Sequence, residues 1–178
     1  MMAPTLRSAR LTLGPATPDH AEAFIAFCAT EHARFIGGPA ERRDASEGAA
    51  IGAGLRAVRG YGPFWVSAND QPVGRVGIYY PDWRAEPELA WVIYPAHQGR
   101  GYATEAALAA RDWAYATLGL APLVSLIDVE NEPSVHVAEK LGAVLEGPHQ
   151  PNGGQDVMRW RHKGAQESGH APTYGIVA

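Results

Sequence analysis

The sequence has very little cysteine and no grouping of side chains that suits a metal. Cys28 is the only cysteine among 178 residues, which excludes both a disulfide framework and a site built from several thiolates. It stands beside Phe24, Ile25 and Phe27, where a free thiol behaves as a small apolar side chain rather than as a nucleophile. The seven histidines are scattered, and none forms a His-x-x-x-His pair. We therefore expect no metal ion.

Long apolar runs and blocks of positive charge are also missing. No stretch of about 18 apolar residues exists, so we expect no membrane span. Residues 1–5 have neither the charged nor the apolar part of a secretory signal, and we expect a cytoplasmic protein. The net charge is −4 without any basic cluster, which argues against nucleic acid as a partner.

The composition that remains is that of a globular protein. Hydrophobic residues make up 46% of the chain and aromatic residues 9%, and 178 residues suit one domain with a substantial core. Recognisable periodicity extends to about residue 162 and is absent from 163–178. We expect one domain over residues 1–162 and a tail over 163–178 that is disordered or lies over a neighbour.

Apolar spacing along this domain alternates between the periods of strands and helices. The predicted order is a strand (6–13), helices beginning at 17 and 44, strands (64–68, 73–80, 88–93), a helix (102–118), a strand (123–129), a helix (134–141) and two last strands near 144 and 156–160. In the second helix, Ile51, Leu55 and Val58 are expected to form the buried stripe. This order predicts an α/β fold with a mixed, mostly antiparallel sheet of six to seven strands and helices on both faces.

The turn over residues 98–104 is where binding chemistry is expected. Gly99 and Gly101 let the backbone curl tightly between a strand and a helix, so that successive N–H groups point into one spot. The positive end of the helix dipole lies at the same place, which makes a site for a diphosphate. Neither the six-residue dinucleotide fingerprint nor the Gly-Lys-Ser/Thr element of nucleotide-triphosphate loops is present.

This turn has ordered companions that resemble a known family. Gln98-x-x-Gly101-x-Ala103, after a strand that ends in Ile93-Tyr94-Pro95, resembles the acyl-CoA signature of the GNAT N-acetyltransferases. The continuation over 102–106 resembles the branch of ribosomal-protein N-terminal (alanine/serine) acetyltransferases. Asn131-x-x-Ser134 and Lys140-Leu141-Gly142 resemble further elements of that branch, and together the matches extend from about residue 5 to 162. Gly14, Ala143 and the short Gly/Pro-rich stretch 147–155 depart from the branch pattern, and the last lies where acceptor specificity is usually set.

The resemblance implies a single GNAT-like domain that uses acetyl-CoA as co-substrate to acetylate a primary amine, either a protein N-terminus or a small molecule. In this family the amine attacks the thioester directly, without an acyl-enzyme. The implied cofactor-binding residues are Val92, Ile93, Gln98, Gly99, Arg100, Gly101, Tyr102, Ala103, Thr104 and Asn131. A non-catalytic acyl-CoA sensor and a transferase that uses a larger acyl group are alternatives on the same scaffold. A homodimer is compatible with the family.

Three residues are candidates for moving protons. Ser134 resembles the residue placed near the sulfur of the cofactor, although it could instead cap the helix over 134–141. Glu88 could accept the proton of the amine through a water, or could be an exposed carboxylate at a strand start. Asp156 matches an acidic position of the branch, where it could simply hold the last hairpin together.

The acceptor amine is expected in a pocket formed by the first two helices and the loops after residues 80 and 147. Aromatic candidates for its wall are Phe35, Tyr61, Trp65, Tyr80 and Trp83. The acidic residues Asp82, Glu86 and Glu88 cluster near the expected opening, where they would favour a cationic amine.

Overall fold

A computed structural model describes residues 4–120, 122–151, 156–164 and 173–177. Its described strands form a single nine-stranded sheet in the order β7-β8-β6-β5-β4-β3-β2-β1-β9. The strands are β1 (Thr5–Arg7), β2 (Thr12–Gly14), β3 (Pro63–Ala68), β4 (Gln71–Tyr79), β5 (Glu88–Ile93), β6 (Val124–Ile127), β7 (Val144–His149), β8 (Val157–Arg161) and β9 (Gly175–Val177). Neighbouring strands run antiparallel except β5 and β6, so the predicted mixed, mostly antiparallel α/β architecture is confirmed.

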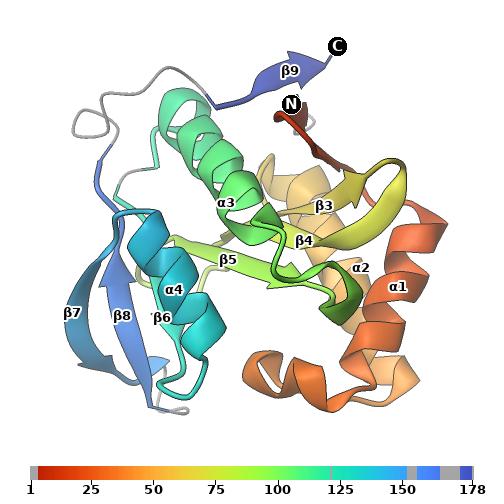
Figure 1. The fold of residues 1–178 in the computed structure, drawn as a ribbon, viewed down its shortest axis with the longest axis horizontal. Coiled ribbons are helices and arrows are strands. Elements are labelled where there is room, and N and C mark those ends of the chain that lie inside the picture. Colours follow the sequence, from red (N-terminus) through yellow and green to blue (C-terminus); the bar gives the residue numbers. More distant parts are fainter. Residues whose placement is uncertain (1–3, 121, 152–155, 165–172, 178) are drawn as a thin grey trace.

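Helices cover both faces of this sheet (Figure 1). They are α1 (Pro18–Cys28), η1 (Glu31–Ile36), α2 (Arg42–Arg59), η2 (Pro95–His97), α3 (Tyr102–Trp113) with its π-helical extension η3 (Ala114–Leu118), and α4 (Glu132–Lys140). The alanines of α3 pack with Leu89 and Ile93 of β5 in the main core. On the opposite face, α1 and α2 enclose a second core around Trp65 of β3.

Among the described strands, the sheet separates at the one parallel pair, β5 and β6. β5 and β6 are paired at Glu88 and Val124 alone, and beyond this point the two strands diverge. The other edge of β5 remains fully paired with β4, from Tyr79–Glu88 to Gly74–Ile93. The end of β5 therefore carries main-chain groups on its β6 side that no neighbouring strand occupies.

The first expected strand is a hairpin of two strands. The chain reverses between β1 and β2, where the Ser8 N–H donates to the Leu11 carbonyl, and Leu6 pairs with Leu13. Residues 175–177, for which the sequence predicted no structure, pair with β1 as β9. These two features account for a sheet with more strands than the six to seven expected.

The predicted buried stripe of α2 was wrong. Ile51 and Val58 are 59% and 82% exposed, and the helix buries Ala45, Ala49 and Gly52 instead. Small residues face the sheet because Pro63 and the Arg75 guanidinium approach the helix closely. A Cβ added to Gly52 would lie 3.0 Å from Pro63 Cγ.

Candidate functional site

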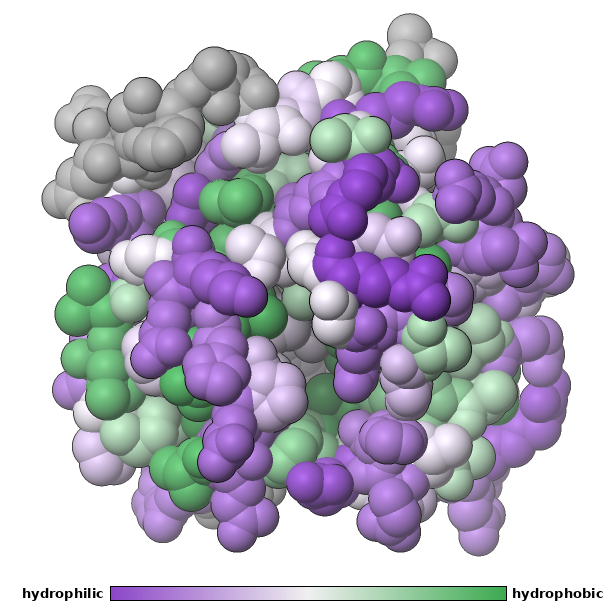
Figure 2. Space-filling model, in the orientation of Figure 1, coloured by the Kyte–Doolittle hydropathy of each residue, from purple (hydrophilic) through white to green (hydrophobic). Residues whose placement is uncertain are grey.

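Two adjoining cavities open beside the end of β5. The larger cavity, of about 410 Å³, lies among η1, the turn before α3 and the first turns of α4. The smaller cavity, of about 350 Å³, lies between the α1–α2 pair and strands β4 and β5. Both are lined by Ile36, Trp91 and Val92, so they meet at β5. Figure 2 shows the surface hollowed between α4 and η1, with apolar residues in the hollow and polar residues around it.

The turn before α3 presents unpaired N–H groups to the larger cavity. Gly99 and Gly101 have φ angles of 74° and 79°, in the left-handed region that favours glycine. Gly101 is the N-cap of α3, and the N–H groups of the following residues Tyr102, Ala103 and Thr104 have no acceptor within the described chain. All five residues line the cavity. The geometry suits a diphosphate at the positive end of the helix dipole.

Arg10, in the β1–β2 hairpin, holds this turn in place by hydrogen bonds. Its Nε donates to Glu105 Oε2 over 2.7 Å, its Nη1 donates to the Arg100 carbonyl over 2.9 Å, and its guanidinium lies 4.9 Å from the Tyr102 ring centroid. Burial alone would raise the pKa of Glu105, but hydrogen bonds from Ser8 and Arg10 outweigh it and lower that pKa. Arg10 was not among the predicted site residues because it lies about ninety positions from the turn in sequence, and no local motif links the two.

Along the unpaired edge of β5, every second residue directs its main-chain N–H and C=O groups away from β4. The Leu89 carbonyl accepts from Ser125 of β6, and the Ile93 carbonyl accepts from the Gln98 amide over 2.8 Å, so these residues turn their main chain away from β4. Trp91, between them, has the same orientation. The Val92 carbonyl instead lies against Gly74 of β4. Of the two predicted residues, Ile93 therefore directs its main-chain groups into the gap between β5 and β6. Val92 lines both cavities, but its main-chain groups are directed towards β4.

Ser134 lies in the first turn of α4 and lines the larger cavity. Its hydroxyl accepts a hydrogen bond from the Trp91 indole N–H over 3.2 Å, which leaves the serine proton free to be donated elsewhere. The helix is capped by Asn131, whose Oδ1 accepts from the Ser134 N–H over 3.3 Å. The alternative role of Ser134 as the helix cap is thus excluded, and Asn131 has that role.

Glu88 is a buried carboxylate at the point where β5 and β6 separate. Its side chain is 13% exposed, and burial raises its pKa to about 7, against the opposing effects of Arg84 at 3.8 Å and a hydrogen bond from the Leu126 N–H. The alternative of an exposed carboxylate is wrong. Glu88 lines neither cavity, but it lies two residues from Ala90, on the sheet face that forms the smaller cavity.

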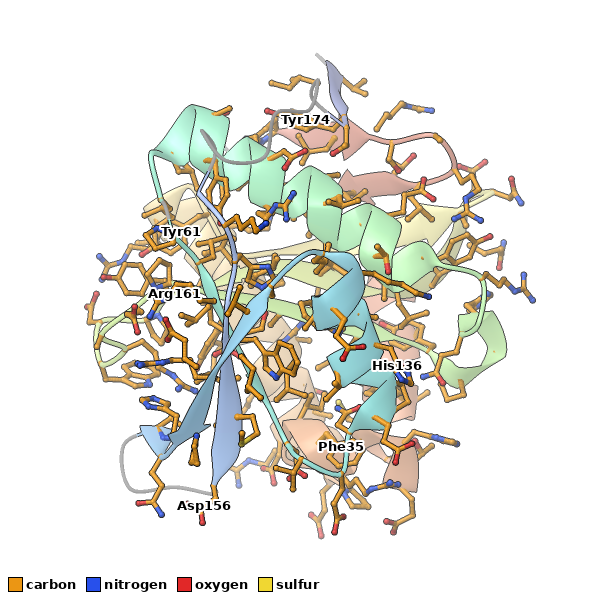
Figure 3. The ribbon with its side chains drawn as sticks, turned by 60° about the vertical axis from the view of Figure 1, so that its left-hand side comes forward. Phe35, Tyr61, His136, Asp156, Arg161 and Tyr174 are labelled. Carbon is orange, nitrogen blue, oxygen red and sulfur yellow. The ribbon has the colours of Figure 1, made fainter. Side chains whose placement is uncertain are left out.

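Ten of the thirteen predicted residues meet in the larger cavity: Val92, Ile93, Gln98, Gly99, Gly101, Tyr102, Ala103, Thr104, Asn131 and Ser134. Arg100 lies outside it and donates to the Ala96 carbonyl over 3.2 Å. Asp156 is exposed at the start of β8, hydrogen-bonded to Gln150, and lines neither cavity. In Figure 3 it lies apart from Phe35 and His136, which both line the larger cavity.

Basic side chains surround the larger cavity despite the negative net charge of the chain. Those that line it are Arg34, Lys140, His32, His97 and His136. Glu130 is the single carboxylate among the lining residues. Arg34 and Lys140 outnumber Glu130, and this excess of positive charge attracts a polyanion. Local sequence patterns did not single out Arg34 and His32, because η1 was not predicted.

Of the segments expected around the acceptor, some line the smaller cavity and others lie elsewhere. The first two helices do form the smaller cavity, but Tyr61 and Tyr80 pack against each other in the main core, and Trp83 is 65% exposed. Trp65 is buried and lines neither cavity, and Phe35 lines the larger one. Residues 152–155 of the loop after 147 lie outside the described residues.

The acidic opening predicted from the sequence is neutralised by arginines. Asp82 pairs with Arg59 at 2.6 Å. Glu86 pairs with Arg159 at 3.3 Å and Arg161 at 2.5 Å, and Glu88 with Arg84. The three carboxylates therefore do not form a free negative surface for a cationic amine.

Comparisons with known proteins bear on the family and the fold of the chain. Residues 10–144 match the family model described as an acetyltransferase (GNAT) domain. A crystal structure of an acetyltransferase from Agrobacterium tumefaciens is 33% identical, with 92% of this chain and 96% of that chain covered and a TM-score of 0.83. The ribosomal L7/L12 alpha-N-protein acetyltransferase RimL, solved in complex with coenzyme A, shares the fold at 19% identity, with coverage of 88% and 96% and a TM-score of 0.69.

Among curated proteins, spermidine N(1)-acetyltransferase from Escherichia coli K12 is 42% identical over 64 residues. That match covers 36% of this chain and 33% of the enzyme, so the chain spans about a third of this relative. The described helices include none that is long and apolar enough to cross a membrane. With the domain model matched over residues 10–144 and a solved acetyltransferase matched over nearly the whole chain, this protein belongs to the GNAT acetyltransferase family.

Proposed function

We propose that this protein transfers an acetyl group from acetyl-CoA to a primary amine by direct attack of the amine on the thioester. The observation that carries the proposal is the larger cavity, in which a glycine turn with free N–H groups, an open strand edge and a serine hydroxyl lie together. The fold is also that of RimL, a protein solved with coenzyme A.

Each part of the larger cavity suits one part of acetyl-CoA. The N–H groups of residues 99–104 would bind the diphosphate, and the basic rim with Arg34 and Lys140 would offset the remaining phosphate charge. The main chain of Trp91 would pair with the amides of the pantetheine arm as an added strand does. The thioester would then lie beside β5, between the two cavities. The amine would enter through the smaller cavity.

The residues around β5 can move the protons that the reaction requires. As the new C–N bond forms, the π electron pair of the C=O bond moves to the carbonyl oxygen; when it returns, the C–S bond breaks and its electron pair passes to sulfur. The Ile93 N–H would stabilise the oxyanion that develops on the carbonyl oxygen. Glu88 would accept the proton of the amine through a water, and the Ser134 hydroxyl would donate a proton to the departing thiolate.

The proposal is tested by measuring thiol release from acetyl-CoA across a panel of primary amines. We expect release that depends on the amine, and we expect the Gly101→Glu variant to lose acetyl-CoA binding in calorimetry. Gly119→Glu is a matched control, because Gly119 also has a positive φ of 66° but lies at the far end of the α3–η3 helix. Tight binding without thiol release on any amine would indicate a sensor instead. Faster release from succinyl-CoA would indicate a larger acyl group.

A further inference from the structure

The smaller cavity contains an arginine that the proposed reaction does not use. Arg75 of β4 places its guanidinium 4.2 Å from the ring centroid of Phe24 and 5.5 Å from that of Trp65. Small residues of α2 leave room for it, since a Cβ on Gly52 would lie only 3.1 Å from Arg75 Nη1. The guanidinium is thereby held in place as part of the cavity wall.

The charge of Arg75 has no counter-charge within the described chain. Its Nη1 donates to the Gly48 carbonyl over 3.4 Å, and no described carboxylate forms an ion pair with it. The nearby polar groups that act on it are the neutral Tyr94, Cys28 and Tyr79, while burial lowers the pKa of its guanidinium. An arginine has five N–H donors, and the bond from Nη1 to Gly48 is the only hydrogen bond that this side chain forms within the described residues.

From this arrangement we infer that the acceptor is an amine that also carries a carboxylate, and that Arg75 binds this carboxylate. The inference rests on the proposed acetyl transfer and names the class of its acceptor. A planar guanidinium matches a carboxylate through two parallel hydrogen bonds, and removal from water strengthens such a pair. The rest of the wall, including Phe24, Ile36 and Pro63, suits an apolar body between the two polar ends of the acceptor.

Strand register places Arg75 beside the reaction centre. Arg75 is directly opposite Val92, which lines both cavities. Gly77 and Ala90 form the next pair on this face and both line the smaller cavity, although the main chain of Gly62 and Pro63 fills the space directly over Gly77. An acceptor bound at Arg75 would therefore extend along β5 towards the thioester and Glu88.

Asp44 is the other charged residue that lines this cavity, but it is exposed in the first turn of α2, where water screens its charge. The less exposed of the two charges that an acceptor meets is therefore the positive one. A polyamine such as spermidine would bring positive charge next to Arg75, and we expect it to be a poor acceptor here.

Two matched series of acceptors test this inference. L-phenylalanine, L-phenylalaninamide and phenethylamine share an apolar body, whereas 6-aminohexanoate, 6-aminohexanamide and hexylamine place the amine further from the carboxylate. In at least one series we expect kcat/KM for the carboxylate to exceed that for its amide by roughly tenfold or more. The amide cannot form the charge-assisted pair with Arg75 that the carboxylate forms. Spermidine should be acetylated more slowly than the best carboxylate.

The Arg75→Gln variant should reduce this ratio to about one and keep acetyl-CoA affinity, since Arg75 does not line the larger cavity. Arg43→Gln, in an exposed ion pair of α2, is the control. Thermal protection of the acetyl-CoA complex by the carboxylates, present in the wild type and lost in Arg75→Gln, reports binding without turnover. Wild-type preference for amides, alkylamines or spermidine would overturn the inference even if Arg75→Gln does not fold. No thiol release on any amine would instead overturn the proposed function.

Discussion

At the residue scale, Glu88 should control the pH dependence of the reaction. Burial raises its pKa to about 7, so the carboxylate form needed to accept a proton becomes dominant only above that pH. We expect kcat/KM to rise through about pH 7, and Glu88→Gln to lower kcat by roughly 100-fold and remove this dependence. The pH–rate profiles of both forms check this, with Glu47→Gln on exposed α2 as the control. An unchanged profile in Glu88→Gln would exclude Glu88 as the base.

The raised pKa of Glu88 should also make the free energy of unfolding depend on pH. Between pH about 4.5 and 7 folded Glu88 keeps a proton that the unfolded chain has released. Stability therefore falls as pH rises across this window, and the loss is complete above pH 7. Relative to wild type, Glu88→Gln should become more stable as pH rises, by up to about 3 kcal/mol. Chemical denaturation at pH 4.5 and 8 measures the difference. An equal free-energy difference at both pH values would contradict the assigned shift.

Ser134 should affect the chemical step more than cofactor binding. Its hydroxyl accepts from Trp91, so its own proton is available to the departing thiolate. We expect Ser134→Ala to lower kcat by roughly 10- to 100-fold while the Kd for acetyl-CoA stays close to wild type. Steady-state kinetics and calorimetry separate the two effects. Ser46→Ala, on the exposed face of α2, is the control, and an unchanged kcat in Ser134→Ala would assign the proton to solvent.

At the scale of elements, the β1–β2 hairpin should hold the turn over residues 99–104 in the shape proposed to bind the diphosphate. Arg10 joins this hairpin to the Arg100 carbonyl and to Glu105 of α3. We expect Arg10→Ala to raise the Kd for acetyl-CoA about tenfold. Hydrogen bonds to charged groups contribute roughly 1.5–3 kcal/mol. Arg10 would affect binding indirectly, because its hydrogen bonds hold the turn in shape. Calorimetry measures the Kd, and Arg43→Ala controls for the loss of a surface charge. An unchanged Kd would show that Gly99 and Gly101 define the turn by themselves.

At the scale of the whole molecule, the C-terminal segment should contribute stability rather than catalysis. β9 pairs with β1 at the sheet edge opposite β7, and the Thr173 hydroxyl donates to Asp112 of α3 over 2.8 Å. Tyr174 lies beside α3 in Figure 3 and packs against the main core. Removing residues 163–178 should lower Tm by several degrees, at about 2–4 °C per kcal/mol, with kcat retained. Loss of thiol release at an unchanged Tm would instead place this segment in the active site.

Local patterns in the sequence were sufficient for the order of most elements and for the turn at 99–104. Glycines at positive φ, a strand before them and a helix after them are neighbours along the chain, so their spacing reports their geometry directly. The buried face of α2 was mispredicted because hydrophobicity suggested Ile51 and Val58, whereas close approach of Arg75 and Pro63 selects small residues.

The sequence by itself indicated the family and singled out the turn at 99–104 and Ser134, which line the larger cavity, because each was recognised from a short local motif. Only the tertiary structure decided that Arg10 braces the turn, that Trp91 rather than Val92 offers its backbone, and that Glu88 is buried. It also decided that the carboxylates at 82, 86 and 88 are paired with arginines, while Arg75 has no counter-charge in the described chain. Charge balance and burial depend on which distant segments meet, and only the folded chain brings those segments together.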